Sequence, residues 1–178
     1  MTEKSDLKEK LRRIRILILD VDGVLTDGGV IYGNGDIEIK KFNIKDGLGI
    51  KLLIRSGITV AVITGRSSKA LARRLHELGV SLIYDGVKDK IPALNEILEK
   101  TDAVFNETAF IGDDLPDIPV LKRAGLAVAV ADAQDDVKRI AHMITEKPGG
   151  RGAVRETAEA ILKAKGLWES IVFSYEEK

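Results

Sequence analysis

The chain has 178 residues, of which 44% are hydrophobic and 31% are charged, a balance typical of an ordinary globular domain. Lysine plus arginine and aspartate plus glutamate both number 28, so the chain lacks the surplus of cations that nucleic-acid coating requires. The absence of cysteine excludes disulfides, thiolate zinc sites and cysteine nucleophiles. The charged N-terminus is unlike a secretory signal, and no apolar run approaches the ~20 residues of a membrane span. We therefore expect one cytoplasmic domain over residues 1–178 that binds neither nucleic acid nor membrane.

Five short apolar segments predict buried strands. They are rich in Ile, Val and Leu and do not alternate with polar residues, which is typical of strands covered on both faces. The segments are Ile14–Leu19, Ile58–Ile63, Ser81–Tyr84, Ala109–Ile111 and Leu126–Val130.

Helical patterns separate these strands. Four helices are expected. The first is capped by Ser67 or Ser68 and closed by Gly79, and the second begins near Pro92. The third lies between Pro116 and Gly125, and the fourth spans Gly152–Lys165 before Gly166. Strict alternation of strand and helix predicts an α/β fold with a doubly wound, Rossmann-like parallel sheet covered by helices on both sides.

Residues 29–42 interrupt this alternation and predict a β-hairpin. Two apolar strands flank Gly33–Asp36, and the pair Asn34-Gly35 is typical of a tight turn in which both residues have positive φ. Because the hairpin is inserted after the first strand, we expect it to project from the sheet. Its apolar side chains then need a partner to cover them.

Polar residues follow the predicted strands where each one ends. In chain order they are Asp20, Asp22, Thr64, Gly65, Arg66, Lys90, Asp113, Asp114 and Asp117. Singly, each has an ordinary explanation as a helix cap, turn or solvated side chain. Together they converge on the sheet edge where open α/β folds bind ligands. Two groups of carboxylates repel each other unless a cation lies between them, and oxygen donors without Cys or clustered His favour Mg²⁺.

The order of these motifs resembles the haloacid dehalogenase superfamily of phosphotransferases. The resemblance runs from residue 14 to about residue 131 and includes the Asp-x-Asp-Gly, Thr-Gly-Arg, Lys and Gly-Asp-Asp-x-x-Asp motifs. It implies that Asp20 is the nucleophile, that Asp22 is the general acid/base, and that Thr64 and Lys90 bind the transferring phosphoryl group. An acid two residues after the nucleophile marks phosphatases in this superfamily.

The same resemblance implies the metal ligands. Asp20, the main-chain carbonyl of Asp22 and Asp113 are expected to hold Mg²⁺, with Asp114 or Asp117 in support. Physical chemistry agrees, because a carboxylate attacking a phosphate forms an aspartyl-phosphate only when a cation offsets the repulsion between the two anions.

Other classes of protein fit less well. A P-loop and a Gly-x-Ser-x-Gly motif are both absent, and His76 and His142 lie in helical patterns. A phospho-accepting receiver domain also has paired acids, a Thr and a Lys, but it would be shorter and would lack the hairpin. A phosphate-binding module without catalytic activity therefore remains the alternative in which the protein is not an enzyme.

The spacing of the motifs leaves no room for a cap domain. Residues 21–63 separate the first two motifs and residues 65–89 separate the next two, whereas an independent domain needs ~50 residues or more. The protein is therefore expected to be capless, so its open site needs another lid.

Finer motifs resemble the family of 3-deoxy-D-manno-octulosonate 8-phosphate phosphatases. Residues 20–28, the hairpin, residues 42–49 and residues 148–155 carry this resemblance. It implies hydrolysis of a sugar-acid phosphate in lipopolysaccharide biosynthesis and a homotetramer. Related enzymes that act on nonulosonate 9-phosphates remain an alternative. The apolar tail 167–178 either completes a neighbouring subunit's site or folds back on its own core.

Charge, spacing and this resemblance together predict the substrate contacts. They are Asp22, Asn43, Ile44, Lys45, Asp46, Gly47, Lys51, Gly65, Arg66, Arg74, Lys90 and Arg151. Arg66 directly follows the Thr-Gly turn and can form two hydrogen bonds to an oxyanion, and Arg74 lies about two helical turns further on.

Overall fold

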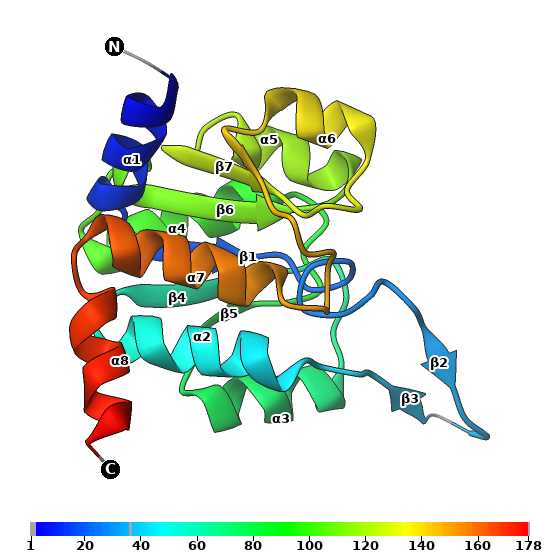
Figure 1. The fold of residues 1–178 in the computed structure, drawn as a ribbon. Helices are drawn as coiled ribbons and strands as arrows, with labels where there is room; N and C mark the ends of the chain where they lie inside the picture. Colours follow the sequence, from blue (N-terminus) through cyan, green and yellow to red (C-terminus); the bar gives the residue numbers. More distant parts are fainter. Residues whose placement is uncertain (1–2, 36, 178) are drawn as a thin grey trace.

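A six-stranded parallel sheet forms the centre of the computed structural model, which describes residues 3–35 and 37–177 (Figure 1). The strand order among these residues is β5-β4-β1-β6-β7-β8. The strands are β1 (Ile16–Leu19), β4 (Thr59–Ile63), β5 (Leu82–Tyr84), β6 (Thr108–Gly112), β7 (Leu126–Ala129) and β8 (Met143–Ile144). The predicted doubly wound sheet is confirmed, and its five expected strands are present with slightly different ends.

Strand β1 lies in the middle of the sheet, which explains why its sequence is uniformly apolar. It pairs in parallel with β4 on one side and β6 on the other, and all four of its residues are buried. Because every strand pair of this sheet is parallel, the carboxyl ends of the strands lie at one edge. The polar residues that follow each strand are therefore brought together.

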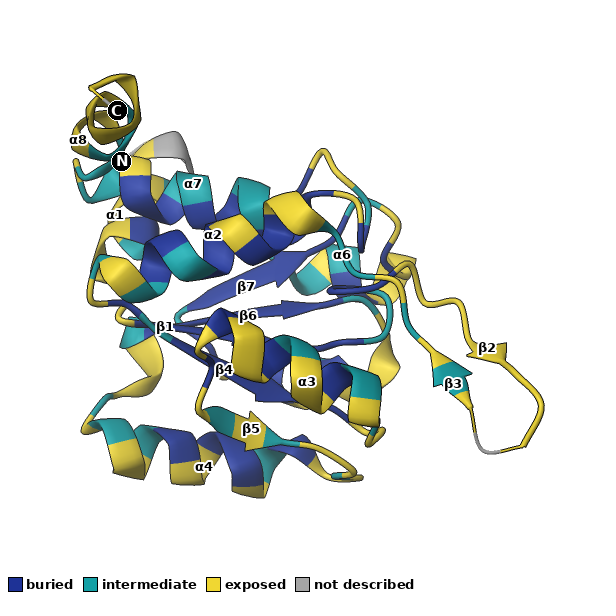
Figure 2. Ribbon diagram, turned by 90° about the horizontal axis from the view of Figure 1, so that it is seen from below, coloured by how far each residue is buried: buried dark blue, intermediate teal, exposed yellow. Residues whose placement is uncertain are grey.

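Helices cover both faces of the sheet (Figure 2). They are α1 (Glu3–Arg13), α2 (Ile44–Arg55), α3 (Lys69–Leu78), α4 (Lys90–Thr101), α5 (Ile118–Leu121), α6 (Asp135–Ile140), α7 (Ala153–Ala164) and α8 (Trp168–Glu176), with short 3₁₀ turns η1 (Phe105–Glu107) and η2 (Leu115–Asp117). Figure 2 shows α2 and α7 packed together on one face and α4 on the other. The predicted cap of α3 is confirmed, since the Ser68 hydroxyl accepts a hydrogen bond from the Leu71 N–H at 3.4 Å and Gly79 ends the helix with a φ of 80°.

Several short elements differ from the prediction. The expected single helix between Pro116 and Gly125 is divided into η2 and α5, because Pro119 near the start of α5 has no N–H with which to continue a helix from η2. Strand β8 and helix α6 were not predicted. Both are short, and a two-residue strand at the sheet edge has no sequence pattern to distinguish it from a loop.

The hairpin is formed by β2 (Ile31–Tyr32) and β3 (Glu38–Ile39), which pair antiparallel and project from the site end of the sheet (Figure 1). The expected turn is wrong in detail. Gly35 has a φ of 72°, but Asn34 does not have a positive φ. The Gly33 N–H donates to the Ile37 carbonyl at 2.8 Å, so the strands are joined beyond this pair rather than directly at a two-residue turn of Asn34 and Gly35. Asp36, within the expected turn, lies outside the described residues.

The apolar tail forms helix α8, at the opposite end of the sheet from the hairpin (Figure 1). Its first turn packs on the chain's own core through Leu167, Trp168 and Ile171, and the Trp168 ring lies 5.3 Å from the Arg155 guanidinium carbon. The second turn leaves Phe173 exposed. Residues 1, 2 and 178 of the expected domain lie outside the described residues, and in the rest of the chain no helix is long and apolar enough to cross a membrane.

Candidate active site

The loop after β1 brings the first acidic pair to the carboxyl edge of the sheet. The Asp20 N–H donates to the Ile111 carbonyl of β6 at 3.1 Å, so the residue continues the sheet and its side chain is buried. Gly23 follows with a φ of 92°, and a Cβ atom there would lie 2.1 Å from Asp113 Oδ2. Glycine at this position therefore permits both the backbone conformation and the close approach of the two acidic motifs.

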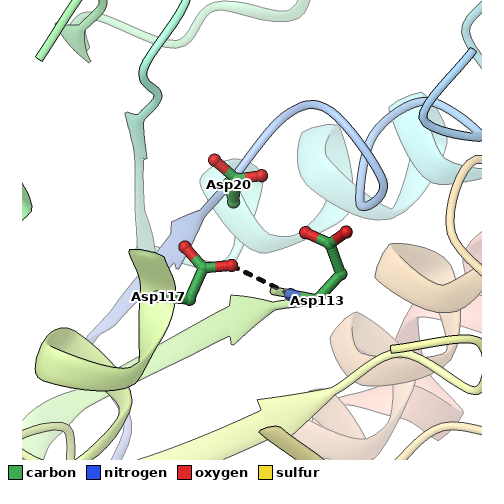
Figure 3. Close-up of side chains that lie close together, drawn as sticks. All are labelled: Asp20, Asp113 and Asp117. Carbon is green, nitrogen blue, oxygen red and sulfur yellow. Dashed lines mark hydrogen bonds between the residues drawn. The ribbon is translucent and has the colours of Figure 1, made fainter. Parts of the chain in front are cut away.

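The second acidic cluster follows β6 and is organised by Asp117. The Asp117 carboxylate accepts hydrogen bonds through Oδ2 from the Asp113 N–H at 2.9 Å (Figure 3) and from the Asp114 N–H at 3.3 Å. The Asp114 carboxylate accepts from the Leu115 N–H at 2.7 Å and so caps η2. The supporting role expected of Asp114 and Asp117 thus has a structural basis, since both shape the loop that presents Asp113.

Lys90 connects the two acidic clusters. It is the first residue of α4, its side chain is 5% exposed, and its Nζ donates to Asp20 Oδ1 at 2.6 Å and to Asp117 Oδ1 at 2.7 Å. A buried ammonium is costly to desolvate unless it is paired. The two carboxylates supply that pairing and keep the cation directed into the site.

One lysine does not balance the carboxylates. Atoms of Asp20, Asp113 and Asp117 lie within 4.8 Å of one another (Figure 3). Burial and the charge of Asp117 raise the pKa of Asp20 to about 6, against the opposing effect of Lys90. Burial and the charge of Asp20 raise the pKa of Asp113 to about 8. Closely spaced oxygen donors with uncompensated negative charge fit a hard divalent cation such as Mg²⁺.

The predicted catalytic residues line one pocket of about 350 Å³. Its lining consists of Asp20, Asp22, Thr64, Gly65, Val87, Lys88, Lys90, Asp113, Asp114, Pro116 and Asp117. Thr64 directly follows β4, is 1% exposed and donates its N–H to the Tyr84 carbonyl at 2.9 Å, which places its hydroxyl at this edge. A carboxylate, a hydroxyl, an ammonium and an acidic cluster thus surround a space large enough for a phosphate group.

Asp22 has a partner that the sequence did not predict. Its Oδ1 forms an ion pair with the Nζ of Lys40, and its Oδ2 lies 3.6 Å from the Nε of Arg66. The hairpin was expected only to project from the sheet, with no contact to Asp22 assigned to it. The alternation of Ile37 and Ile39 with Glu38 and Lys40 was the available signal, because it places both charged side chains on one face.

Arg66 lies at the rim of the pocket and contacts the hairpin. Its Nη2 donates to the Tyr32 hydroxyl and to Glu38 Oε2, both at 3.2 Å, and its side chain is 42% exposed. Gly65 lines the pocket itself. Two of the predicted substrate contacts are therefore beside the predicted catalytic residues.

Asn43, Gly47 and Arg74 form a separate group at the start of α2. The Asn43 side chain caps this helix by accepting from the Lys45 N–H at 2.8 Å. Arg74 Nη2 lies 3.5 Å from the Asn43 carbonyl, and a Cβ atom at Gly47 would lie 2.2 Å from that nitrogen. Glycine at position 47 therefore makes room for the arginine.

Asp46 has a structural role in this chain that its prediction as a substrate contact did not include. Its carboxylate is buried and accepts hydrogen bonds from the N–H groups of Gly152 at 3.1 Å and Arg155 at 2.8 Å. These groups lie at the N-terminus of α7, so Asp46 on α2 caps a different helix. Burial raises the pKa of Asp46, and the two N–H groups oppose that rise.

The remaining predicted contacts lie outside the main pocket. Lys45 and Arg151 line a second pocket of about 390 Å³ together with residues at the start of α7. Ile44 is 77% exposed. Lys51 lines neither of these pockets.

Known proteins share this fold and much of this sequence. Residues 82–155 match the model of the haloacid dehalogenase-like hydrolases. The 3-deoxy-D-manno-octulosonate 8-phosphate phosphatase of Yersinia pestis is 47% identical over 165 residues, which cover 93% of this chain and 88% of the relative. Identity at this level over nearly the whole length is stronger evidence for the family than the separate motifs are.

Two solved structures of such phosphatases agree with the fold. The enzyme from Moraxella catarrhalis, in complex with a magnesium ion, a phosphate ion and a KDO molecule, is 40% identical with a TM-score of 0.94, covering 96% of this chain and 98% of its own. The cobalt-bound enzyme from Haemophilus influenzae is 42% identical with a TM-score of 0.86, covering 89% and 93%.

Fold and site together define a hydrolase that acts on phosphate monoesters. The four sequence motifs at the carboxyl edge of the sheet had predicted this class of enzyme. The chain belongs to the haloacid dehalogenase-like hydrolases, in the family of the 3-deoxy-D-manno-octulosonate 8-phosphate phosphatases. The predicted family, enzyme class and divalent-cation cofactor are thereby confirmed. The cluster of Asp20, Asp113 and Asp117 is consistent with such a cation.

Proposed function

We propose that this chain hydrolyses 3-deoxy-D-manno-octulosonate 8-phosphate to the free sugar acid and phosphate, with Mg²⁺ as its cofactor. The observation that carries the proposal is the convergence of Asp20, Thr64, Lys90 and Asp113 on one pocket. The substrate follows from relatives of that name at 45–47% identity and from the neighbour that holds a KDO molecule. Such a pathway enzyme would act in the cytoplasm.

The first step transfers the phosphoryl group to Asp20. An oxygen of its carboxylate attacks phosphorus, the bond from phosphorus to the sugar oxygen breaks, and Asp22 gives a proton to that departing oxygen. Thr64, the Gly65 N–H and Lys90 would donate hydrogen bonds to the phosphoryl oxygens as charge accumulates on them.

The second step releases phosphate. Asp22, now ionised, takes a proton from a water molecule, whose oxygen attacks the phosphorus of the aspartyl-phosphate and restores the Asp20 carboxylate. Asp20, the main-chain carbonyl of Asp22 and Asp113 would hold Mg²⁺. When bound, the cation offsets the repulsion between the anionic nucleophile and the anionic ester.

A substrate comparison tests the proposal. We expect kcat/KM to be highest for 3-deoxy-D-manno-octulosonate 8-phosphate, lower for a nonulosonate 9-phosphate and lowest for para-nitrophenyl phosphate, with phosphate release dependent on Mg²⁺. Preference for the nonulosonate would contradict the substrate assignment. A failure of all three esters to turn over would contradict the enzyme assignment and favour a phosphate-binding module without catalytic activity.

Variants of the acidic pair test the mechanism with the same assay. Asp20→Asn removes the nucleophile with little change in shape, so turnover should vanish while the fold persists by circular dichroism. Asp22→Asn should lower kcat by ~10²–10⁴-fold, the usual contribution of a positioned acid/base. Rates like those of the unmodified protein in either variant would refute the corresponding role.

A further inference from the structure

The two catalytic steps proposed above do not use the ion pair between the hairpin and Asp22. Lys40 directly follows β3, and its side chain is 2% exposed even though the hairpin projects from the sheet. Its Nζ contacts Asp22 Oδ1 and lies 3.3 Å from Glu38 Oε1. Burying an ammonium is unfavourable unless anions compensate it. The two carboxylates therefore hold the Lys40 cation at one place beside the catalytic loop.

The polar face of the hairpin anchors this arrangement. Tyr32 and Glu38 are opposite each other across β2 and β3, and both contact Arg66 Nη2 at 3.2 Å. Arg66 Nε lies 3.6 Å from Asp22 Oδ2, which is too far for a hydrogen bond. Of the two Asp22 oxygens, Oδ1 therefore has the closer cationic partner, and Oδ2 makes no hydrogen bond to Arg66.

We propose that Lys40 is a positioning residue for the acid/base Asp22, an inference that rests on the proposed phosphatase function. By occupying Oδ1, the ammonium fixes the plane of the carboxylate and directs Oδ2 to the leaving-group oxygen. In the first step the proton on Oδ2 passes to the sugar oxygen as its bond to phosphorus breaks, and Asp22 is left as the carboxylate that Lys40 stabilises. The hairpin thus contributes to catalysis within a single chain.

The dependence of rate on the leaving group distinguishes this role from simple support of the hairpin. A para-nitrophenolate ion departs without a proton, whereas an alkoxide requires one, so loss of acid catalysis slows alkyl esters most. We expect Lys40→Met to lower kcat/KM for sugar and alkyl phosphates ~10–100-fold more than for para-nitrophenyl phosphate. The quantity kcat/KM is suitable because it reports the steps up to the first bond cleavage.

Lys41→Met is the matched control. Lys41 is the next residue, its side chain is 67% exposed, and it pairs with Asp27 at 2.9 Å away from Asp22. The control should keep the leaving-group dependence of the unmodified protein. Lys40→Arg, which preserves the charge, should restore much of that dependence.

Several outcomes would overturn the proposal. Equal losses on alkyl and aryl esters in Lys40→Met would show that Lys40 only supports the fold, and Lys40→Gln carries the same comparison if the Met variant does not fold. In the Asp22→Asn background, Lys40→Met should add no change in leaving-group dependence, and a further change would mean that Lys40 acts elsewhere.

If the unmodified protein hydrolyses no ester with Mg²⁺, the proposed function fails and this inference fails with it. Turnover with unaltered leaving-group dependence in the variant defeats the inference alone.

Discussion

At the scale of single residues, the site is an arrangement of charges that is incomplete without a bound cation. Lys90 pairs with Asp20 and Asp117, but the pKa of Asp113 is raised to about 8 because burial and the neighbouring carboxylates disfavour its charged form. Such a group gives up its proton when a cation binds beside it. The acidic cluster therefore couples metal binding to pH and to folding.

The raised pKa values of the acidic cluster predict how the stabilising effect of Mg²⁺ depends on pH. In the metal-free native state Asp113 and Asp20 keep protons that the unfolded chain releases near pH 4. Their contribution to the free energy of unfolding therefore falls as pH rises from about 4 to about 8. Mg²⁺ binds the ionised carboxylates, so the increase in Tm caused by saturating Mg²⁺ should be larger near pH 8 than near pH 5.

Thermal unfolding with and without Mg²⁺ at both pH values measures this effect. Asp113→Asn is the control, since it removes the group with the larger shift and should greatly reduce the Mg²⁺-dependent increase at both pH values. An increase in Tm that is equal at the two pH values would contradict the coupling between proton release and cation binding in this cluster.

At the scale of elements, α2 and α7 are joined by a cap that crosses between them. Asp46 lies in the first turn of α2 and accepts hydrogen bonds from two N–H groups at the start of α7. Those N–H groups have no intrahelical acceptor, because the first turn of any helix leaves its donors unpaired. The Asp46 carboxylate satisfies these donors and also fixes the loop of residues 147–152. This loop packs against the loop after β1, since a Cβ atom at Gly149 would lie 1.7 Å from the Gly23 carbonyl.

Removing this cap should destabilise the protein more than removing an exposed one. We expect Asp46→Ala to lower the free energy of unfolding by about 2–3 kcal/mol, because one buried and one partly buried donor lose their acceptor. Asp89→Ala is the control. Asp89 caps α4 through a single exposed contact with the Ile91 N–H at 3.0 Å, so its loss should cost about 1 kcal/mol or less. Denaturant unfolding of both variants measures the difference, and equal losses would show that Asp46 is not a cap of this strength.

At the scale of the whole molecule, the hairpin leaves apolar side chains in solvent. Ile31, Ile37 and Ile39 are each more than half exposed, and the hairpin that carries them projects from the sheet (Figures 1 and 2). Isolated two-stranded hairpins are marginally stable, and contiguous exposed apolar surface marks an interface. We propose that hairpins of neighbouring chains cover one another in a homotetramer and that the tetramer provides the lid that the capless site needs.

Light scattering at micromolar concentration tests the assembly. The unmodified protein should have the mass of four chains, and the double variant Ile37→Asp/Ile39→Asp should dissociate, because charges then replace the apolar contact. Val104→Asp is the control, since Val104 is 62% exposed but lies at the start of η1 rather than on the hairpin. A single-chain mass for the unmodified protein would exclude the assembly.

The sequence by itself determined the sheet and the core of the site. Strands, caps and motif order are local properties, since an apolar run such as Ile16–Leu19 or a cap such as Ser68 depends on neighbours a few residues away. Because parallel strands end at one edge, the residues after them had to meet, so Asp20, Thr64, Lys90 and Asp113 were predictable as a group.

Only the tertiary structure decided which charged groups pair. Lys40 contacts Asp22 across 18 residues, and Asp46 caps a helix more than a hundred residues away. Neither contact has a spacing that the sequence displays, because each depends on how the hairpin bends back and how α2 lies on α7. Ion pairs and caps between distant segments form where the fold leaves a buried polar group unsatisfied, and that place exists only once the chain has folded.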